Sequence, residues 1–433
     1  MSTTYDPKNP MYLDEADVRE ELTRVYDLCH GCRLCFKFCS SFPTLFDLID
    51  RFDDQDAGRL TPAEQDKVID ECFQCKLCYV NCPYIPELHE WALDFPRLML
   101  RADAMRYSTG QKSIRSRATT QVLGRTDLMG TAATAVSSVA NKVVAAPSNS
   151  PIRKAVAVAT GVSAVRLLPP YAKQRFSTWF RKRVKPTITR RQGSVTVFPT
   201  CLVEYQETAI GQDLVKVYER NGIETTVTEA GCCGAPWLHS GDLKQFTKVA
   251  EKNVKTLADE VRRGGDIVVP QPTCGYVLKK DYLDYVGGPD AELVAEHTFD
   301  AAEYLMKVHK GDDTELDTEF GGEVPENVTY HAACHLRAQN IGFKSRDLMK
   351  LTGSKVKVIQ QCSGIDGMWG LRAENEQFSI PIAEKLADQI TKAGAQVVTG
   401  DCQLANTAIE EQTGSPSVHP IQFIARAYGI DPE

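Results

Sequence analysis

The sequence predicts a multidomain α+β protein: a helical N-terminal domain with two cysteine runs, then two repeated α/β units of βαβαβ order. Eight cysteines within the first 82 residues form two runs of identical spacing. After residue 191, short β-branched runs alternate with amphipathic stretches, which is typical of parallel sheets. The expected domains are 1–104, a basic segment over 105–192, a first α/β unit over 193–320, and a second over 321–433.

The two cysteine runs predict metal clusters. The first run is Cys29, Cys32, Cys35 and Cys39, and the second is Cys72, Cys75, Cys78 and Cys82, followed by Pro83. This spacing is typical of thiolates that bind 4Fe-4S clusters, and in two-cluster ferredoxins the fourth cysteine of each run binds the other cluster. We therefore expect two 4Fe-4S clusters, one on Cys29, Cys32, Cys35 and Cys82 and the other on Cys72, Cys75, Cys78 and Cys39. Zinc is the alternative, but zinc sites prefer separated CxxC pairs with longer gaps.

The residues between the runs predict a helix. Thr61, Pro62 and Glu64 have the order of an N-cap, a first-turn proline and a capping-box acid ahead of Lys67–Cys72. A helical spacer favours a helical ferredoxin domain over the compact β-rich type.

Composition indicates an ordinary globular protein. The chain has 433 residues, 42% apolar and 25% charged. The stretch from Met1 to Glu21 is polar and acidic, so we expect no secretory signal. Fifteen cysteines, an odd number, then predict metal ligands or redox groups in a reducing compartment. The expected location is the cytoplasm, with peripheral contact to the inner face of the cell membrane as a further option.

The segment from Met105 to Arg191 is strongly basic. It contains seventeen Lys or Arg and a single acid, Asp127, so it carries +16 in a chain whose net charge is −7. Its uncharged runs are shorter than the roughly 20 apolar residues that a membrane-spanning helix needs. Two interpretations stay open. The segment lies on an anionic membrane, where Trp179 and Phe180 precede three basic residues and each Lys or Arg contributes about 1 kcal/mol, or it wraps the acidic remainder of the chain or an acidic partner subunit.

Seven further cysteines follow predicted strands. In the first unit Val195–Pro199, Glu224–Glu229 and Ile267–Pro270 precede Cys201, Cys232 with Cys233, and Cys274. In the second unit Asn327–Tyr330, Lys355–Ile359 and Gln396–Thr399 precede Cys334, Cys362 and Cys402. The predicted helices are Tyr205–Asn221, Asp242–Arg263 and Arg372–Ala393. Ligands bind beyond the carboxyl ends of parallel strands, so the spacing predicts sites there. Buried core cysteines are the alternative, and the matched positions in both units disfavour it.

Cys201, Cys232-Cys233-Gly234 and Cys274, repeated imperfectly after two four-cysteine runs, resemble the CCG-domain iron-sulfur proteins. This family includes cysteine-rich subunits of heterodisulfide reductase and iron-sulfur subunits of glycolate oxidase and anaerobic glycerol-3-phosphate dehydrogenase. The resemblance implies that the ferredoxin domain conducts electrons and that the CCG domains hold a metal centre or act as a thiol and disulfide site. It makes Cys232 and Cys233 the candidate catalytic residues.

Both units depart from the five-cysteine CCG pattern. The first has Val277 in place of the last cysteine, and the second has Ser363 and Ala405 in place of two. Cys201, Cys232, Cys233 and Cys274 still offer four thiolates for a further Fe-S cluster or zinc. Cys334, Cys362 and Cys402 leave one position for His331, His335, Asp401 or an external ligand, unless this unit has lost its centre.

No dinucleotide fingerprint or P-loop is visible, so we expect a partner to supply electrons. The predicted function is an iron-sulfur electron-transfer subunit of an oxidoreductase. Electrons would pass from a flavin-containing dehydrogenase subunit or another redox protein through two 4Fe-4S clusters to the CCG site and on to quinone. Reduction of a disulfide at the CCG site is the alternative. A nucleic-acid-binding iron-sulfur protein and a structural adaptor are less favoured, and no nucleic-acid partner is expected because the basic segment matches no known module.

Overall fold

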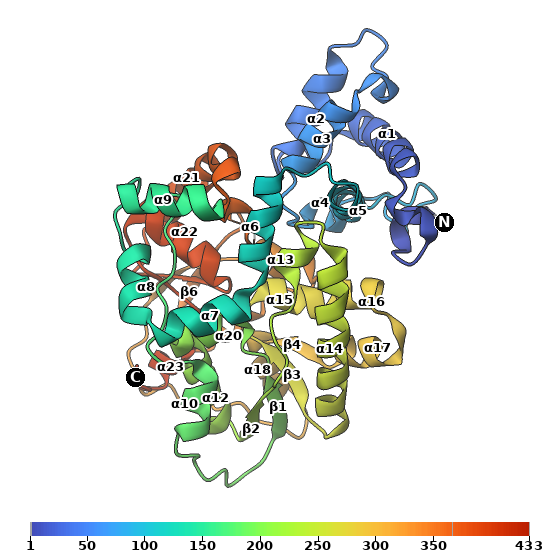
Figure 1. Ribbon diagram of the computed structural model, residues 1–433. Helices are drawn as coiled ribbons and strands as arrows, with labels where there is room; N and C mark the ends of the chain where they lie inside the picture. Colours follow the sequence, from blue (N-terminus) through green and yellow to red (C-terminus); the bar gives the residue numbers. More distant parts are fainter. Residues whose placement is uncertain (1, 366, 433) are drawn as a thin grey trace.

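The computed structural model describes residues 2–365 and 367–432, so the outer limits of the predicted domains, residues 1 and 433, lie outside it. A helical N-terminal domain sits at one end of an α/β body, and helices of the basic segment run along one side of that body (Figure 1).

The N-terminal domain is helical, as predicted. Its α-helices are α1 (Glu15–Cys32), α2 (Ser41–Asp50), α3 (Pro62–Asp70), α4 (Leu77–Val80) and α5 (Phe95–Ser108), with short helices η1 (Thr3–Tyr5), η2 (Pro10–Leu13) and η3 (Ala57–Arg59). The predicted capping box is confirmed, because Thr61 and Glu64 cap α3 reciprocally. Helix α3 ends at Asp70, two residues before Cys72, so the second cysteine run begins in irregular backbone.

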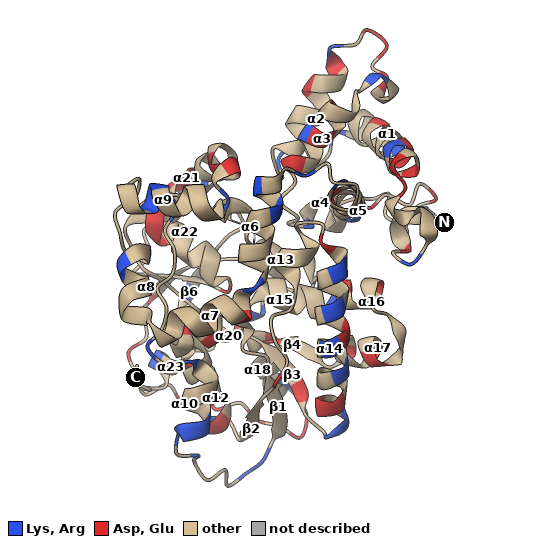
Figure 2. Cartoon of the chain, in the orientation of Figure 1, with Lys and Arg blue, Asp and Glu red and all other residues tan. Residues whose placement is uncertain are grey.

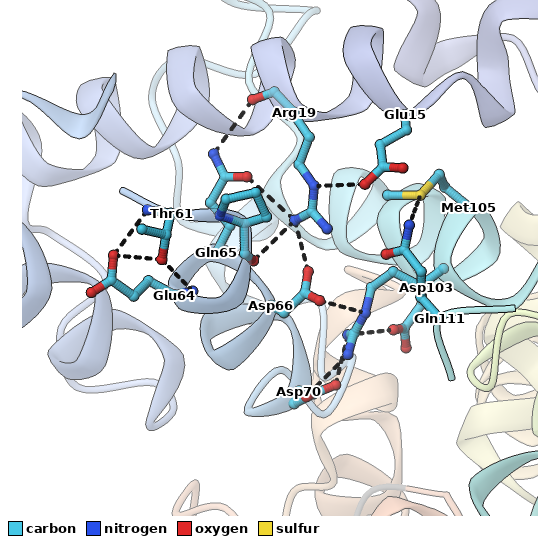
Figure 3. Close-up of polar contacts among 12 residues, drawn as sticks. Glu15, Arg19, Thr61, Glu64, Gln65, Asp66, Asp70, Asp103, Met105 and Gln111 are labelled. Carbon is cyan, nitrogen blue, oxygen red and sulfur yellow. Dashed lines mark hydrogen bonds and ion pairs between the residues drawn. The ribbon is translucent and has the colours of Figure 1, made fainter. Parts of the chain in front are cut away.

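Two arginines join the helices of this domain (Figure 3). Arg19 of α1 pairs with Asp66 of α3 at 2.7 Å, and Arg106 of α5 pairs with the same carboxylate at 3.2 Å and with Asp70 at 2.7 Å. Both guanidinium groups are largely buried, and such paired charges resist separation because each would otherwise be left buried alone. The network fixes α3 between α1 and α5, directly before the second cysteine run.

Each α/β unit contains a four-stranded parallel sheet. The first sheet has the order β2-β1-β3-β4, from β1 (Gly193–Val197), β2 (Ile223–Val227), β3 (Asp266–Val269) and β4 (Thr298–Asp300). The second has the order β6-β5-β7-β8, from β5 (Asn327–His331), β6 (Lys355–Ile359), β7 (Val397–Gly400) and β8 (Ser417–Val418). The six predicted strands are confirmed. The predicted βαβαβ order is one strand short in each unit, because the short edge strands β4 and β8 contain no β-branched run to detect.

Helices cover both sheets. Those of the first unit are α11 (Thr200–Tyr205), α12 (Thr208–Arg220), α13 (Ala235–Leu238), α14 (Leu243–Arg262), α15 (Pro272–Tyr276), the π-helix η4 (Val277–Asp281), α16 (Tyr282–Tyr285), α17 (Gly288–Glu296) and α18 (Ala301–Lys310). Those of the second are α19 (Cys334–Ala338), α20 (Lys344–Lys350), η5 (Trp369–Leu371), η6 (Ala373–Asn375), α21 (Glu376–Ala393), α22 (Gln403–Thr413) and α23 (Pro420–Ala427). Val197 of β1 and Tyr330 of β5 belong to one buried cluster, so the two units share a core.

The basic segment folds onto the α/β body. It forms α6 (Ile114–Gly124), α7 (Thr126–Ala135), α8 (Ser137–Val144), α9 (Pro151–Thr160) and α10 (Phe176–Lys182). Arg166 pairs with Glu411 at 2.9 Å and Arg183 with Glu219 at 2.5 Å, both across to the α/β units. Trp179 and Phe180 pack against the shared core. These contacts favour the interpretation in which the segment wraps the acidic remainder of the chain, and the aromatic pair expected at a membrane surface is engaged inside the protein.

Candidate functional site

The CCG cysteines lie where the strand pattern predicted them. In the first unit, Cys201 follows β1, Cys232 and Cys233 follow β2, and Cys274 lies in α15 just after β3. In the second unit, Cys334, Cys362 and Cys402 follow β5, β6 and β7 in the same way. All fifteen cysteines lie in the described part of the chain, and none of them forms a disulfide. The carboxyl ends of both sheets therefore carry thiols.

The four thiols of the first unit form a connected set. The sulfurs of Cys233 and Cys274 are 3.2 Å apart. Hydrogen bonds from the Cys201 and Cys233 thiols lower the pKa of Cys232 well below its usual value, whereas donation to Cys232 raises the pKa of Cys201. Cys232 is therefore the most readily ionised of these thiols, whereas its hydrogen bonds to Cys232 and Cys274 raise the pKa of Cys233 well above its usual value.

Backbone contacts hold the Cys232-Cys233 turn in place. Asn253 Nδ2 donates to the Cys232 carbonyl at 2.9 Å, and the Tyr282 hydroxyl donates to the Cys233 carbonyl at 3.0 Å. Gly234 has a φ of 90°, and a Cβ there would lie 2.9 Å from Phe246, so glycine is required. The turn that presents the adjacent cysteines is thus fixed from both sides.

Asp127, the one acid of the basic segment, also contacts this turn. Its Oδ2 accepts a hydrogen bond of 2.9 Å from the backbone N–H of Cys232. Helix α7 thereby contacts the turn that carries the two adjacent cysteines.

A cavity of about 80 Å³ lies over the thiols. The second unit contributes Cys402, Met368, Trp369 and Arg372 to its wall, next to Cys201, Cys232, Cys233, Cys274 and His239 of the first. His239 Nε2 is buried without a hydrogen-bond partner among residues 2–365 and 367–432. Burial, with help from Lys76 and His335, lowers the pKa of His239 well below its usual value, so the ring is neutral. Sequence reasoning missed His239, because a single histidine without metal-ligand spacing gives no signal.

The cysteines of the second unit are divided between two places. Cys402 packs with Cys201 and Leu202 beside the thiol cavity. Cys334 and Cys362 instead contact the buried group Phe73, Cys75 and Leu77 of the N-terminal domain. The structure thus does not gather all three in one pocket of the second unit.

The other candidate ligands of that unit are engaged elsewhere. Asp401 accepts a hydrogen bond of 2.5 Å from Tyr330 and another from Ser345. His331 Nε2 is 3.0 Å from the Gln361 carbonyl. His335 bridges Gln74 O and Thr273 Oγ1, each at 2.9 Å, so it joins the N-terminal domain to the first unit. These contacts give all three side chains a structural role in the fold.

The eight N-terminal cysteines lie close together across the two runs. Burial raises the pKa of Cys29 well above its usual value, and the charges of Cys35, Cys82 and Cys32 add to the rise. Burial likewise raises the pKa of Cys78, with contributions from Cys75, Cys35 and Cys39. The fourth cysteine of each run is therefore a neighbour of the other run. This proximity fits the crossed ligand sets expected for two cubane clusters, which would supply one-electron transfer.

The described part of the chain holds no ready-made site for a single metal ion. In the described ranges, no three His, Cys, Asp or Glu side chains converge closely enough to hold one metal ion. Cubane thiolates each bind a different iron atom, so a cubane does not need three thiolates on one ion. The four CCG thiols, in contrast, are not arranged as ligands of one zinc ion.

The N-terminal domain contacts the CCG units through Phe73 and Lys76, in the second cysteine run. The rings of Phe73 and Trp369 are 5.2 Å apart, and Trp369 Nε1 donates to the Asp70 carbonyl at 3.1 Å. Lys76 is buried, and its Nζ lies 5.8 Å from the centre of the Tyr276 ring. One aromatic pair therefore connects the loop of the second run to the wall of the thiol cavity. No spacing pattern in the sequence pointed to Lys76 or Trp369.

No helix in residues 2–365 and 367–432 has the length and apolarity needed to cross a bilayer.

Comparison with known proteins identifies the α/β units. Residues 195–279 and 328–409 match the family model of the CCG cysteine-rich domain. The chain is 29% identical over 327 residues to a subunit of the anaerobic glycerol-3-phosphate dehydrogenase of Escherichia coli, and the match covers 74% of this chain and 79% of that protein. It is 28% identical over 227 residues to lactate utilization protein A of Bacillus pumilus, covering 48% of this chain and 87% of that protein.

The chain is therefore a protein with two CCG cysteine-rich domains, homologous to these two relatives. The predicted resemblance is confirmed, and the first relative is by its name a subunit of a dehydrogenase.

Proposed function

We propose that this protein is the iron-sulfur electron-transfer subunit of a dehydrogenase complex. Electrons enter from a flavin-containing partner, pass through two 4Fe-4S clusters on the eight N-terminal cysteines, and reach the thiol site of the first CCG domain. A membrane quinone is the terminal acceptor. Homology to a dehydrogenase subunit and to a lactate utilization protein supports an oxidoreductase role.

One observation carries the proposal. The loop of the second cysteine run contacts the wall of the CCG cavity through Phe73 and Trp369, whose rings are 5.2 Å apart. A cluster on Cys72, Cys75, Cys78 and Cys39 would thus lie beside the site that it must reduce. Cys334 and Cys362 border the same junction, so the second CCG domain serves mainly to dock the N-terminal domain.

Peripheral membrane contact is also part of the proposal, at the inner face of the cell membrane. Helices α6 to α9 leave apolar side chains exposed, among them Ile114, Leu128, Val136, Val139, Ile152 and Val158. Figure 2 shows little charge along α7 and α8, with basic residues nearby. An apolar face flanked by Lys and Arg fits the boundary of an anionic bilayer.

Disulfide reduction is the second candidate, and the pair Cys233 and Cys274 favours it because their sulfurs are 3.2 Å apart. Stopped-flow mixing of the reduced protein with either a soluble short-chain quinone or a mixed disulfide distinguishes the two. Reoxidation of the clusters by quinone, abolished in Cys232→Ser but with cluster content retained, supports the main proposal. Reoxidation only by the disulfide supports the second candidate. If neither acceptor reoxidises the clusters, both candidates are refuted.

A further inference from the structure

We infer that a second cavity, located between the basic segment and the two CCG domains, binds the ring of the quinone. This inference rests on the proposed function and assigns a place to its acceptor. The cavity has a volume of about 180 Å³. Its wall comes from three parts of the chain and is mainly apolar: Leu123, Met129, Leu168, Leu202, Met368 and Leu404.

The cavity adjoins the thiol site. Cys201, Leu202, Met368 and Leu404 line both this cavity and the smaller one over the four thiols. Cys201 is therefore the thiol at the border, and it is hydrogen-bonded to Cys232. A quinone ring in the apolar cavity would therefore lie next to the thiol site. This is the site from which the quinone must receive its electrons.

The size of the cavity limits its ligand. Pockets for drug-sized molecules have volumes of roughly 300–1,000 Å³, and the two cavities, at about 180 and 80 Å³, are smaller. A single ring system fits, whereas a long isoprenoid chain must extend outside. Met129 lines the cavity and is 47% exposed, and its neighbour Leu128 is 63% exposed. The cavity thus reaches the surface on the apolar side of α7, where a lipid tail finds a matching environment.

Tyr171 supplies a polar group to the cavity. Asn141 fixes the backbone of Tyr171 by two hydrogen bonds of 2.8 Å, and Tyr171 lines the cavity together with Cys201. Burial, followed by the charge of Cys201, raises the pKa of Tyr171, so the phenol stays protonated. A protonated phenol donates to a quinone carbonyl oxygen, which only accepts.

Reduction of a quinone to the hydroquinone takes two electrons and two protons. Two electrons, delivered one at a time from the partner dehydrogenase through the two clusters, reduce the quinone. Two protons complete the hydroquinone: Tyr171 passes the first and is reprotonated from solvent, and the second comes from solvent through the open side of the cavity.

Binding of a fluorescent alkyl-hydroxyquinoline N-oxide, a quinone analogue, tests the inference with no need for turnover. The oxygen-free holoprotein in detergent micelles is expected to quench the probe on binding. Leu168→Trp fills the cavity and should weaken binding at least tenfold. Leu167→Trp is the matched control, since Leu167 is 38% exposed and outside the cavity wall, and it should bind within twofold of the unsubstituted protein. Tyr171→Phe should weaken binding several-fold. EPR spectra of the clusters, unchanged in all three variants, would show that they are folded.

Two results would overturn the inference: no quenching by the unsubstituted protein, or equal quenching by Leu168→Trp and Leu167→Trp. Either result leaves the electron-transfer role standing if the clusters are still reoxidised by a soluble quinone, which would then react at another place. Failure of the clusters to accept electrons from any reductant would instead refute the proposed function itself.

Discussion

Asp127 Oδ2 accepts a hydrogen bond of 2.9 Å from the backbone N–H of Cys232, so the single acid of residues 105–191, which include seventeen Lys or Arg, contacts the candidate catalytic cysteine. A carboxylate at that position anchors α7 over the thiols. It also adds negative charge next to the residue whose thiolate the other cysteines stabilise.

Removing this anchor should expose Cys232. In Asp127→Ala the hydrogen bond is lost, and such bonds to charged groups contribute about 1.5–3 kcal/mol. We expect iodoacetamide to label Cys232 several-fold faster than in the unsubstituted protein, as measured by peptide mass spectrometry. Asp127→Asn, which still accepts from the N–H, should differ by less than twofold. Equal labelling in all three proteins would show that the contact does not hold the segment in place.

Lys76 should raise the reduction potential of the second cluster. A buried cation in the ligand loop favours the reduced, more negative state, and neighbouring charges in a protein interact by about 1–4 kcal/mol. Since about 1.4 kcal/mol corresponds to roughly 59 mV for one electron, Lys76→Met should lower the potential by tens of millivolts in an EPR-monitored titration.

Lys67→Met provides the control for Lys76, because Lys67 is an exposed residue of α3 close to the same run. The charge of Lys67 is screened by water, so the reduction potential of the second cluster should change little in Lys67→Met. A shift of the same size in both variants would mean that overall charge, and not the buried position of Lys76, sets the potential.

Trp369 should control electron transfer between the domains. Trp369→Ala removes both the ring contact with Phe73 and the hydrogen bond to Asp70, and should slow quinone-dependent reoxidation of the clusters at least tenfold. Trp369→Phe keeps a ring at this position and should retain most of the rate. If the alanine variant reacts at the original rate, electrons leave the N-terminal domain by another route.

Crossed ligation of the N-terminal clusters makes a pairwise prediction. Cys82→Ser should remove the same EPR signal as Cys32→Ser, although the two residues belong to different runs. Cys39→Ser should remove the signal that Cys75→Ser removes. If Cys82→Ser and Cys75→Ser share a phenotype instead, each run binds its own cluster.

Asp281 should make stability fall with rising pH. It lies in the π-helix η4, with Oδ2 buried and without a partner in the described ranges, and burial raises its pKa from 3.8 to about 7. The folded state binds this proton more tightly than the unfolded state, so the stabilisation is complete below pH 3.8 and is lost, at no more than about 1.4 kcal/mol per pH unit, as pH rises to about 7.

Asp281→Asn removes this pH dependence. The thermal midpoint of Asp281→Asn minus that of the unsubstituted protein, both measured without oxygen, should become larger between about pH 4 and about pH 8. Asp312→Asn, at an exposed position, should follow the unsubstituted protein at every pH. A constant difference between Asp281→Asn and the unsubstituted protein would show that Asp281 does not titrate in this range.

The sequence predicted the regular parts of the fold well. β-branched residues in runs such as Lys355–Ile359 favour strands, and the capping box at Thr61 defines a helix start locally. Edge strands β4 and β8, with three and two residues, are too short to leave a period-two pattern, and only pairing with β3 and β7 makes them strands. The basic segment was equally ambiguous, since its charge pattern does not say whether lipid or protein opposes it.

For the candidate site, sequence spacing predicted the cysteines but not their surroundings. The position of each CCG cysteine follows from the strand before it. Cys334 and Cys362 lie against the N-terminal domain, whereas Cys402 lies beside the thiol cavity. This separation depends on where the N-terminal domain docks, which no local pattern encodes. His239, Lys76 and Trp369 enter the site through long-range packing and have no motif.

The content of iron and sulfide per chain, measured after purification without oxygen and combined with EPR during reductive titration, tests the central claim most directly. Two cubane clusters predict about eight irons and two reducible signals. About twelve or more irons would add a cluster at Cys201, Cys232, Cys233 and Cys274. A chain that binds fewer than about four irons, or whose clusters cannot be reduced, would contradict an electron-transfer role.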